Sequence, residues 1–308
     1  MKRLLPLLFL LIATVGLNAQ TPADSTKKAK SDSTTKAQVK RWKTGFEFGV
    51  NFGAANFSNN WQGGGVSNYA LGSLLNAKAS YKDRDSAFVW DNVLNLQYGI
   101  MRNKGQSARK SNDLIFFDSK LGYKFHKAWS AFAGVNFLSQ FAFGYEYGTD
   151  ANGIETRKRI SSVMSPGYLT ESVGIEYKPV KYFSARLGIG AMRQTFVLNQ
   201  SVYNLVDTVK YGVPVGKKVR NEIGFQFLVN FDKDLHKNIN LKARYLGFYN
   251  YSDLSFNKID HRLDVIFTAK ITRFINVSFN TIFLYDFDQI DSWQHSQAFA
   301  LGILYKMK

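Results

Sequence analysis

The stretch Ile223-Gly-Phe-Gln-Phe-Leu-Val-Asn-Phe231 places an apolar residue at every odd position and mostly small or polar residues between them. This period of two is typical of a β-strand with one apolar face, because successive side chains point to opposite sides of a strand. The same alternation recurs on both sides of this stretch, from residue 44 to the end of the chain, with no segment of helical period between. The sequence therefore predicts an all-β domain over residues 44–308.

About twelve segments carry the pattern, and their apolar faces span residues 46–52, 69–81, 94–100, 115–125, 129–143, 169–177, 183–197, 223–231, 239–249, 263–271, 275–285 and 299–307. Alternation alone also fits a soluble β-sandwich or a lipocalin-like barrel, in which the apolar face is the inside. Three further features favour a membrane barrel, in which the apolar face is the outside.

Most glycines of the segments fall on the polar face, where they would relieve crowding inside a closed barrel, and Gly247 is the exception on the apolar face. The polar-face glycines are Gly49, Gly72, Gly99, Gly122, Gly134, Gly144, Gly174, Gly188, Gly190, Gly224 and Gly302. The connections alternate between short ones, such as 126–127, 232–238 and 272–274, and longer ones, such as 103–112, 148–162 and 200–218. Aromatic residues such as Tyr81, Tyr123 and Trp129 stand beside the short connections. Short periplasmic turns, long outer loops and aromatic girdles are typical of outer-membrane barrels.

We therefore predict an antiparallel transmembrane β-barrel of about twelve strands, with no transmembrane helix in the mature protein. An even strand number brings both termini to the periplasmic side of the outer membrane of a Gram-negative bacterium.

The first 43 residues differ from the rest of the chain. Leu4 to Leu17 is an apolar run that follows Lys2 and Arg3 and ends before Ala19, which indicates a signal peptide over residues 1–19. Residues 20–43 are rich in Thr, Ser, Lys, Ala and Asp, which predicts a flexible periplasmic linker. The chain contains no Cys, so disulfides, thiolate catalysis and a lipid-anchored cysteine are excluded.

The chain is strongly basic, with a formal net charge of +17 and a mean hydropathy of −0.21. A basic protein favours anionic partners. Because the predicted signal peptide directs the chain out of the cytoplasm, we do not expect nucleic acid to be that partner. We expect as partners the outer-membrane lipid and glycolipid, the barrel-assembly machinery during biogenesis, and other outer-membrane proteins.

Three stretches, Phe57-Ser-Asn-Asn-Trp-Gln-Gly-Gly-Gly65, Gly212-Val-Pro-Val-Gly-Lys-Lys-Val-Arg-Asn-Glu222 and Ser296-Gln-Ala-Phe-Ala-Leu-Gly-Ile-Leu-Tyr305, resemble a family of Bacteroidetes-type outer-membrane barrels of unassigned function. The resemblance covers nearly the whole barrel. It implies a fold and a location, and it supplies no activity. Such barrels commonly finish on an aromatic residue, whereas this chain ends Tyr305-Lys-Met-Lys308. Recognition of the last strand would then depend on Phe299, Ile303 and Tyr305.

The sequence indicates no catalytic residue, no metal site and no cofactor. His261 and His295 share the outward face, but neither has a Ser partner there, as hydrolysis would require. Residues 212–218 lack the glycine spacing and the Ser or Thr of a phosphate loop. The acidic groups at 150–155 and 286–291 fit no EF-hand, and Asn152-Gly153 is better explained as a hairpin turn. We predict that the protein is not an enzyme.

The polar face supplies the predicted pore-lining residues: Lys78, Lys120, Lys124, Arg186, Arg220, Glu222, Lys242, Arg244, Arg262, Asp264, Lys270 and Asp286. The predicted extracellular-loop residues are Trp61, Gln62, Gly63, Gly64, Gly65, Arg157, Lys158 and Arg159. The leading hypothesis is a narrow pore or small-solute channel that favours anions, with Lys242, Arg244, Arg262 and Lys270 as a basic wall. The alternative is a non-conducting structural or accessory subunit of a larger outer-membrane complex.

Overall fold

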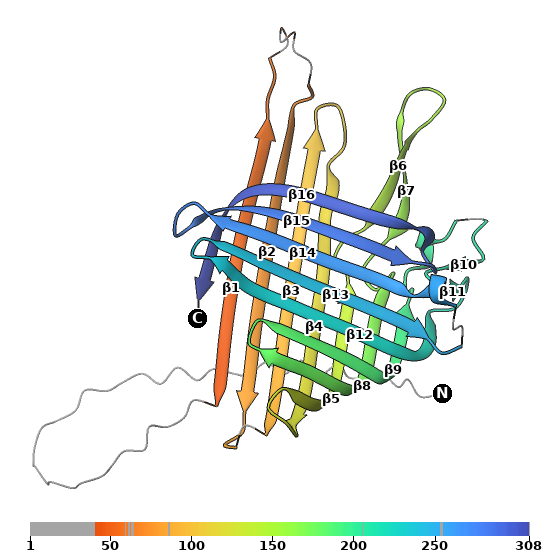
Figure 1. Ribbon diagram of the computed structural model, residues 1–308. Coiled ribbons are helices and arrows are strands. Elements are labelled where there is room, and N and C mark those ends of the chain that lie inside the picture. Colours follow the sequence, from red (N-terminus) through yellow and green to blue (C-terminus); the bar gives the residue numbers. More distant parts are fainter. Residues whose placement is uncertain are drawn as a thin grey trace, which may run out of the picture. The chain divides into compact units, whose positions relative to one another are not determined.

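The computed structural model describes residues 41–307 except 59, 61, 63, 64, 86, 205, 253 and 254. The predicted signal peptide, most of the predicted linker, and Trp61, Gly63 and Gly64 lie outside the described residues. Twelve antiparallel strands close into a barrel in the order β1-β16-β15-β14-β13-β12-β9-β8-β5-β4-β3-β2 (Figure 1). The predicted closed, antiparallel all-β barrel and its number of strands are confirmed.

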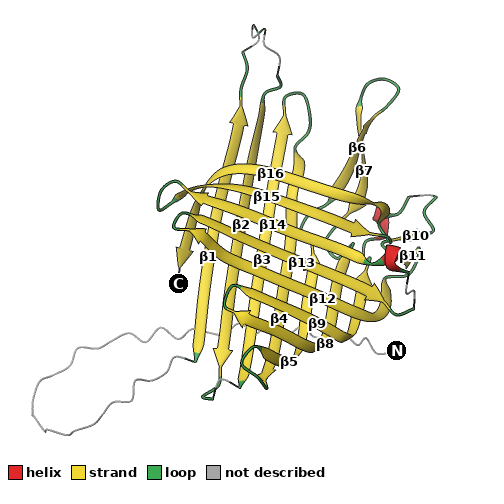
Figure 2. Cartoon of the chain, viewed as in Figure 1, coloured by secondary structure: helices red, strands yellow, loops and turns green. Residues whose placement is uncertain are grey.

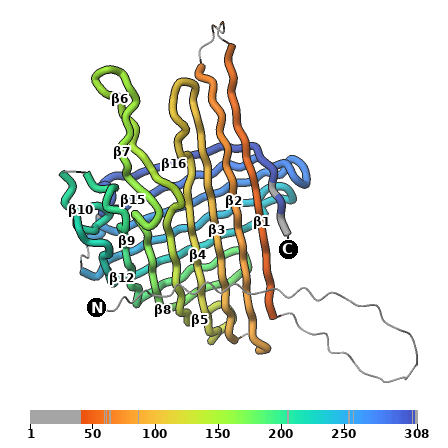
Figure 3. Tube along the Cα trace, turned by 180° about the vertical axis from the view of Figure 1, so that it is seen from behind, coloured from red at the N-terminus to blue at the C-terminus, as the bar shows by residue number. Residues whose placement is uncertain are grey.

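The barrel strands are β1 (Trp42–Ala55), β2 (Asn68–Lys82), β3 (Phe88–Asn103), β4 (Arg109–Lys124), β5 (Trp129–Ser139), β8 (Gly167–Val180), β9 (Phe183–Phe196), β12 (Val219–His236), β13 (Ile239–Asn250), β14 (Asp260–Lys270), β15 (Ile275–Asp286) and β16 (Ile290–Met307). Strands on opposite walls cross one another, as β1–β5 and β12–β16 do in Figure 3. Such crossing follows from the tilt that strands adopt in a closed barrel.

Two small hairpins and two helical turns lie outside the barrel wall, all on the side of the long loops (Figure 2). The hairpins are β6 (Gly144–Thr149) with β7 (Glu155–Ser161), and β10 (Val209–Lys210) with β11 (Val213–Pro214). The turns are η1 (Gln200–Val202) and η2 (Phe256–Lys258). None of the helical segments in the described part of the chain has the length and apolar character needed to cross a membrane.

The β6–β7 hairpin confirms the turn predicted at Asn152-Gly153. Gly153 has a positive φ of 78°, and the Asp150 carboxylate accepts hydrogen bonds from the backbone N–H groups of Asn152 and Ile154 at 2.9 and 2.8 Å. The carboxylate is therefore used to close the turn. No group of three or more metal-ligating side chains is found among the described residues.

Three predicted boundaries were wrong by a few residues. The first strand begins at Trp42 rather than residue 44, and β12 continues to His236, where a connection over 232–238 was predicted. The segment predicted over 129–143 ends as a strand at Ser139. There the Asp113 carboxylate accepts the N–H groups of Phe141 and Ala142 at 2.7 and 2.9 Å, which removes them from strand pairing.

A β-bulge in β9 is the largest departure from simple alternation. Gly190 and Gly188 of β9 face the consecutive residues Val173 and Gly174 of β8, so one residue, Ile189, is unpaired there. An extra residue exchanges the two faces of the strand beyond it. Val197, predicted on the outward face, is therefore fully buried on the inner side. The carbonyl of Ile189, freed by the bulge, accepts a hydrogen bond from the Tyr251 hydroxyl.

Glycines permit close contact between strands at the crowded inner positions. A Cβ built on Gly224 would lie 2.0 Å from the carbonyl oxygen of Tyr249, and one on Gly174 would lie 1.9 Å from that of Leu187. Backbone atoms cannot move away from an added Cβ as the end of a flexible side chain can, so only glycine fits at these two positions. These positions explain why glycines gather on the polar face.

The strand pair that closes the barrel is the shortest of the wall. β1 and β16 pair over seven residues, from Phe46 opposite Met307 to Phe52 opposite Leu301. The other neighbouring strands of the described wall pair over ten to fifteen residues. Beyond Phe52 no described pairing joins β16 to β1.

Candidate functional site: the charged lumen

The outer surface of the barrel is apolar. Outward side chains from many strands are large and exposed, including Phe52, Leu121, Val173, Ile223 and Phe299. Near the short turns the aromatic rings contact one another along the wall, with centroids of Trp42 and Tyr81 5.2 Å apart and those of Trp129 and Tyr177 4.6 Å apart. The inner face, by contrast, holds buried polar and charged residues such as Asp118, Glu176 and Glu222. The charged side chains that could contact a solute therefore line the lumen.

Apolar side chains of β4 and β12 are buried inside the barrel, where the guanidinium of Arg244 reaches the ring of Phe116. Leu114 and Phe116 of β4, Leu228 of β12 and the Arg244 side chain of β13 form what we call the central partition, and the three apolar members are at most 6% exposed. The guanidinium carbon of Arg244 lies 3.8 Å from the centroid of the Phe116 ring. In the ring of strands β13 and β4 are separated by four others on the shorter side, so this contact crosses the lumen. The partition separates two cavities that share only Leu114 among their lining residues.

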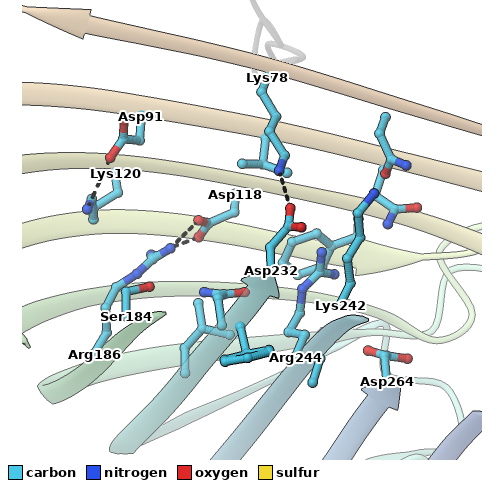
Figure 4. A pocket seen from close by; sticks show the side chains of 18 of the residues that line it. Lys78, Asp91, Asp118, Lys120, Ser184, Arg186, Asp232, Lys242, Arg244 and Asp264 are labelled. Carbon is cyan, nitrogen blue, oxygen red and sulfur yellow. Dashed lines mark hydrogen bonds and ion pairs between the residues drawn. The ribbon is translucent and has the colours of Figure 1, made fainter. Parts of the chain in front are cut away.

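The cavity on the short-turn side, here the turn-side chamber, has a volume of about 350 Å³. Ion pairs cross it between strands that are not neighbours. The Arg186 guanidinium donates to the Asp118 carboxylate at 3.0 Å, Lys78 Nζ lies 3.1 Å from Asp232, and Lys242 Nζ lies 2.8 Å from Glu47. Figure 4 shows the first two pairs and the Lys120–Asp91 pair projecting into the cavity.

The cavity on the long-loop side, here the loop-side chamber, has a volume of about 300 Å³. The Tyr168 hydroxyl donates across the lumen to the Asp286 carboxylate at 3.1 Å, and Arg193 pairs with Glu222 and Asp260. Residues of the long loops also line this chamber, among them Gln140, Ile160, Pro166 and Tyr211.

The long loop between β9 and β12 is itself packed around a small core. Val197, Val202 and Val213 are fully buried against Tyr203 and Tyr211. Burial raises the pKa of the Tyr211 hydroxyl well above its usual range, so the group stays protonated and donates to the carbonyl of Ile160 at 2.6 Å. The loop is thereby held over the loop-side chamber.

The predicted pore-lining residues are distributed over several cavities. Lys78, Lys120, Arg186, Lys242, Arg244 and Asp264 line the turn-side chamber, Arg262 and Asp286 the loop-side chamber, and Arg220 and Glu222 a smaller cavity beside it. Lys124 lines a cavity at the short-turn end, and Lys270, at the end of β14, is exposed and lines none of these cavities.

The predicted basic wall is mostly neutralised. Lys242 is paired with Glu47, and the Arg262 guanidinium donates to Asp264 at 2.8 Å. The sequence could not show these pairs, because Glu47 comes from a strand 195 residues away. Arg193 was missed altogether, since plain alternation places it on the outer face, whereas the β9 bulge brings it inside.

The predicted extracellular-loop residues lie at two places. Arg157, Lys158 and Arg159 are on β7 of the hairpin that projects from the barrel in Figure 1. The Arg157 and Arg159 guanidiniums lie over the rings of Tyr145 and Phe143, at 4.9 and 4.1 Å from the centroids. Gln62 and Gly65 lie in the loop between β1 and β2, where Gly65 has a φ of 119°.

Several solved barrels are similar to the chain at low sequence identity. The translocator domain of the autotransporter NalP from Neisseria meningitidis is 9% identical, with a TM-score of 0.38 over 88% of this chain and 90% of that one. An outer-membrane channel from Pseudomonas putida F1 is 9% identical, with a TM-score of 0.38 over 90% and 99%. The NanC porin is 8% identical, with a TM-score of 0.36 over 85% and 100%. These values support no functional inference.

No curated protein is similar enough in sequence to match the chain. One family model matches part of it. The match includes the stretch 57–65 on which the family resemblance was based and excludes the stretches at 212–222 and 296–305, so it is narrower than expected. Residues 52–145, from the end of β1 to the start of β6, match a family described as a protein of unknown function (DUF3078).

Proposed function

We propose that this chain is an integral outer-membrane β-barrel that acts as a narrow, solute-selective channel favouring small anions. Its apolar outer surface and the aromatic rings near the short turns support a membrane location. In a bilayer every backbone polar group needs an internal partner, and a closed barrel supplies them. On this proposal the short turns and both termini face the periplasm, and the long loops and the β6–β7 hairpin face outward.

The observation that carries the channel proposal is the central partition between two charged cavities. It consists of side chains of the barrel strands, and on this proposal changes of side-chain rotamer open it. Leu114, Phe116 and Leu228 are buried there and, on the same proposal, restrict free diffusion in the closed conformation. An open porin would instead have a continuous aqueous lumen.

Planar-bilayer recording tests this proposal. We expect a small, anion-selective conductance for the wild-type protein and a clearly larger one for the double variant Leu114→Ala with Phe116→Ala. Phe117→Ala is the matched control, because Phe117 is the next residue on the same strand and faces outward. If heat-modifiable, folded protein conducts in neither the wild-type nor the double variant, the channel proposal is wrong.

A second candidate function is a non-conducting subunit of a larger outer-membrane complex. The β6–β7 hairpin favours it, since the hairpin projects beyond the wall (Figure 1) and carries Tyr145 and the three basic residues Arg157, Lys158 and Arg159. A pull-down from solubilised outer membrane with and without residues 144–161 tests it: a partner that is lost with the hairpin supports the subunit role.

A further inference from the structure

The charges of the turn-side chamber leave one guanidinium unmatched. Lys78, Lys120, Arg186 and Lys242 each contact a carboxylate, at distances of 2.5 to 3.3 Å. Arg244 has no hydrogen bond or ion pair to any residue in the described ranges, and no dashed line reaches it in Figure 4. Asp264 lies opposite it on β14, but that carboxylate accepts hydrogen bonds from Arg262.

Arg244 lines the turn-side chamber and lies over the Phe116 ring. One face of the guanidinium rests on the Phe116 ring, so the N–H groups, which lie in the guanidinium plane, point sideways. Five donors held in a rigid fork match a carboxylate, which can accept two of them at once. Water or an anion in the chamber must therefore accept the hydrogen bonds that the Arg244 guanidinium donates.

The mouth of the chamber is strongly basic. A second cavity of about 400 Å³ opens at the short turns and shares Ser80, Asp91, Lys120, Glu176, Lys178 and Lys181 with the turn-side chamber. Its two carboxylates, Asp91 and Glu176, both contact Lys120. The other lysines that line it form no ion pair with a carboxylate in the described part of the chain: Lys43, Lys82, Lys124, Lys127, Lys178 and Lys181. Concentrated positive charge at a narrow entrance raises the local concentration of anions.

Part of the wall near Arg244 is apolar, although Asp264 lies opposite it on β14. Phe116 and Leu228 are almost fully buried, and Leu114 and Ile266 line the same chamber. A volume of about 350 Å³ is at the small end of the range for ligand sites. We infer that the turn-side chamber is a binding site for a small carboxylate with an apolar body, which enters between the lysines of the mouth and pairs with Arg244 while its body packs against the central partition.

This inference deepens the proposed channel function by naming its solute class, and binding can be measured without conduction. Isothermal titration calorimetry on the detergent-purified, folded barrel uses benzoate, its neutral analogue benzamide, and inorganic phosphate. We expect benzoate to bind more tightly than either of the others. Loss of a charge-assisted, bidentate pair in Arg244→Gln weakens benzoate binding by on the order of tenfold or more. Arg273→Gln, in a short turn where the guanidinium stacks on Phe274, should bind like the wild type.

A second variant avoids the buried arginine. Lys124→Gln with Lys178→Gln removes two exposed mouth lysines, and we expect slower benzoate association at low salt, with the difference disappearing at high salt. Equal binding of benzoate and benzamide, or wild-type affinity in Arg244→Gln, would overturn the site. Phosphate that binds as tightly as benzoate overturns the apolar-body assignment. If the barrel binds benzoate but never conducts, the binding site is supported and the channel proposal is wrong. If it conducts but does not bind benzoate, the channel proposal is supported and the binding site is wrong.

Discussion

Lys78 Nζ lies 3.1 Å from the Asp232 carboxylate and so joins β2 to β12, which occupy opposite positions in the ring of twelve strands with five strands between them on either side. Both side chains are about half exposed to the lumen. The pair spans the turn-side chamber without being shielded from water.

We therefore expect the Lys78–Asp232 pair to contribute little to stability. Solvated ion pairs typically contribute about 0–1 kcal/mol. In a double-mutant cycle with Lys78→Ala and Asp232→Ala, measured by equilibrium unfolding from lipid vesicles, the coupling free energy should stay below about 1 kcal/mol. A much larger coupling would show that the chamber is drier than the structure indicates.

Replacement of Phe227 by Arg tests which face of the wall meets lipid. Phe227 is an outward residue of β12, and Arg near the bilayer midplane costs about 2–4 kcal/mol of folding free energy. Ser296→Arg is the control, because Ser296 is exposed on the inner face of β16. Gln226 is unsuitable as a control, since it is buried and accepts a hydrogen bond from Ser172. A greater loss for Ser296→Arg than for Phe227→Arg, in the same unfolding experiment, would reverse the assignment of inside and outside.

Gly224→Ala should be strongly destabilising. The added Cβ would lie 2.0 Å from the carbonyl oxygen of Tyr249, so β12 and β13 would have to separate locally. We expect a loss of about 1–3 kcal/mol, the range for overpacking in a filled interior. Gly45→Ala, with no atom within 4 Å of its added Cβ, should fold like the wild type. Comparable heat-modifiable fractions for the two variants in a gel assay would contradict the crowding argument.

The attachment of the β6–β7 hairpin to the neighbouring loop should depend on pH. Hydrogen bonds from Ser107 and Arg109 to Glu155, at 2.5 and 2.7 Å, hold the pKa of that carboxyl below its usual 4.5. Because the attached state has the lower pKa, the attachment is complete above pH 4.5 and is lost as the pH falls through the depressed value. Hydrogen-exchange protection over residues 144–161, corrected for the pH dependence of the intrinsic exchange rate, should fall on acidification, and Glu155→Gln should show low protection at every pH. Protection in the wild type that does not change with pH excludes this role for Glu155.

Neutralising the hairpin arginines should weaken binding of glycolipid. Arg157 and Arg159 are held over aromatic rings, and Arg159 also donates to the Ser201 hydroxyl at 2.6 Å, so the remaining guanidinium N–H groups are left for phosphate groups. We expect less glycolipid to co-purify with Arg157→Gln/Arg159→Gln than with the wild type, as measured by mass spectrometry of the extracted lipid. Lys127→Gln is the control, because Lys127 has the same charge but lies at the short-turn end of the barrel. Unchanged recovery in the arginine variant would leave these residues as solvated charge only.

The sequence predicted the barrel well because a period of two is a local property of each strand. Side-chain direction at Phe227, Arg186 or Lys242 follows from parity alone. Parity failed for Arg193 and Val197, since the bulge at Ile189 exchanges the faces without a change in composition. The pairing of charges was beyond the sequence, because Lys242 and Glu47 meet only through the closure of the barrel. The mouth lysines in the turns, such as Lys127 and Lys181, follow no strand pattern and were missed for that reason.

The short pairing between β1 and β16, here the β1–β16 seam, indicates which strand pair forms last when the barrel assembles. Phe46 and Met307 lie at almost opposite ends of the described chain, and their pairing closes the largest loop that the barrel contains. Contacts of such long sequence separation form late, because the entropy of loop closure is lost before the bonds are gained. Seven residue pairs then complete the ring, fewer than at any other junction of the described wall. Until the last strand arrives both edges are unpaired, and in the proposed membrane location unpaired edges would be costly, so insertion would require them to be shielded. On that proposal the β1–β16 seam is where an insertion catalyst would hold the nascent barrel open, and a disulfide engineered between β1 and β16 would trap the finished ring.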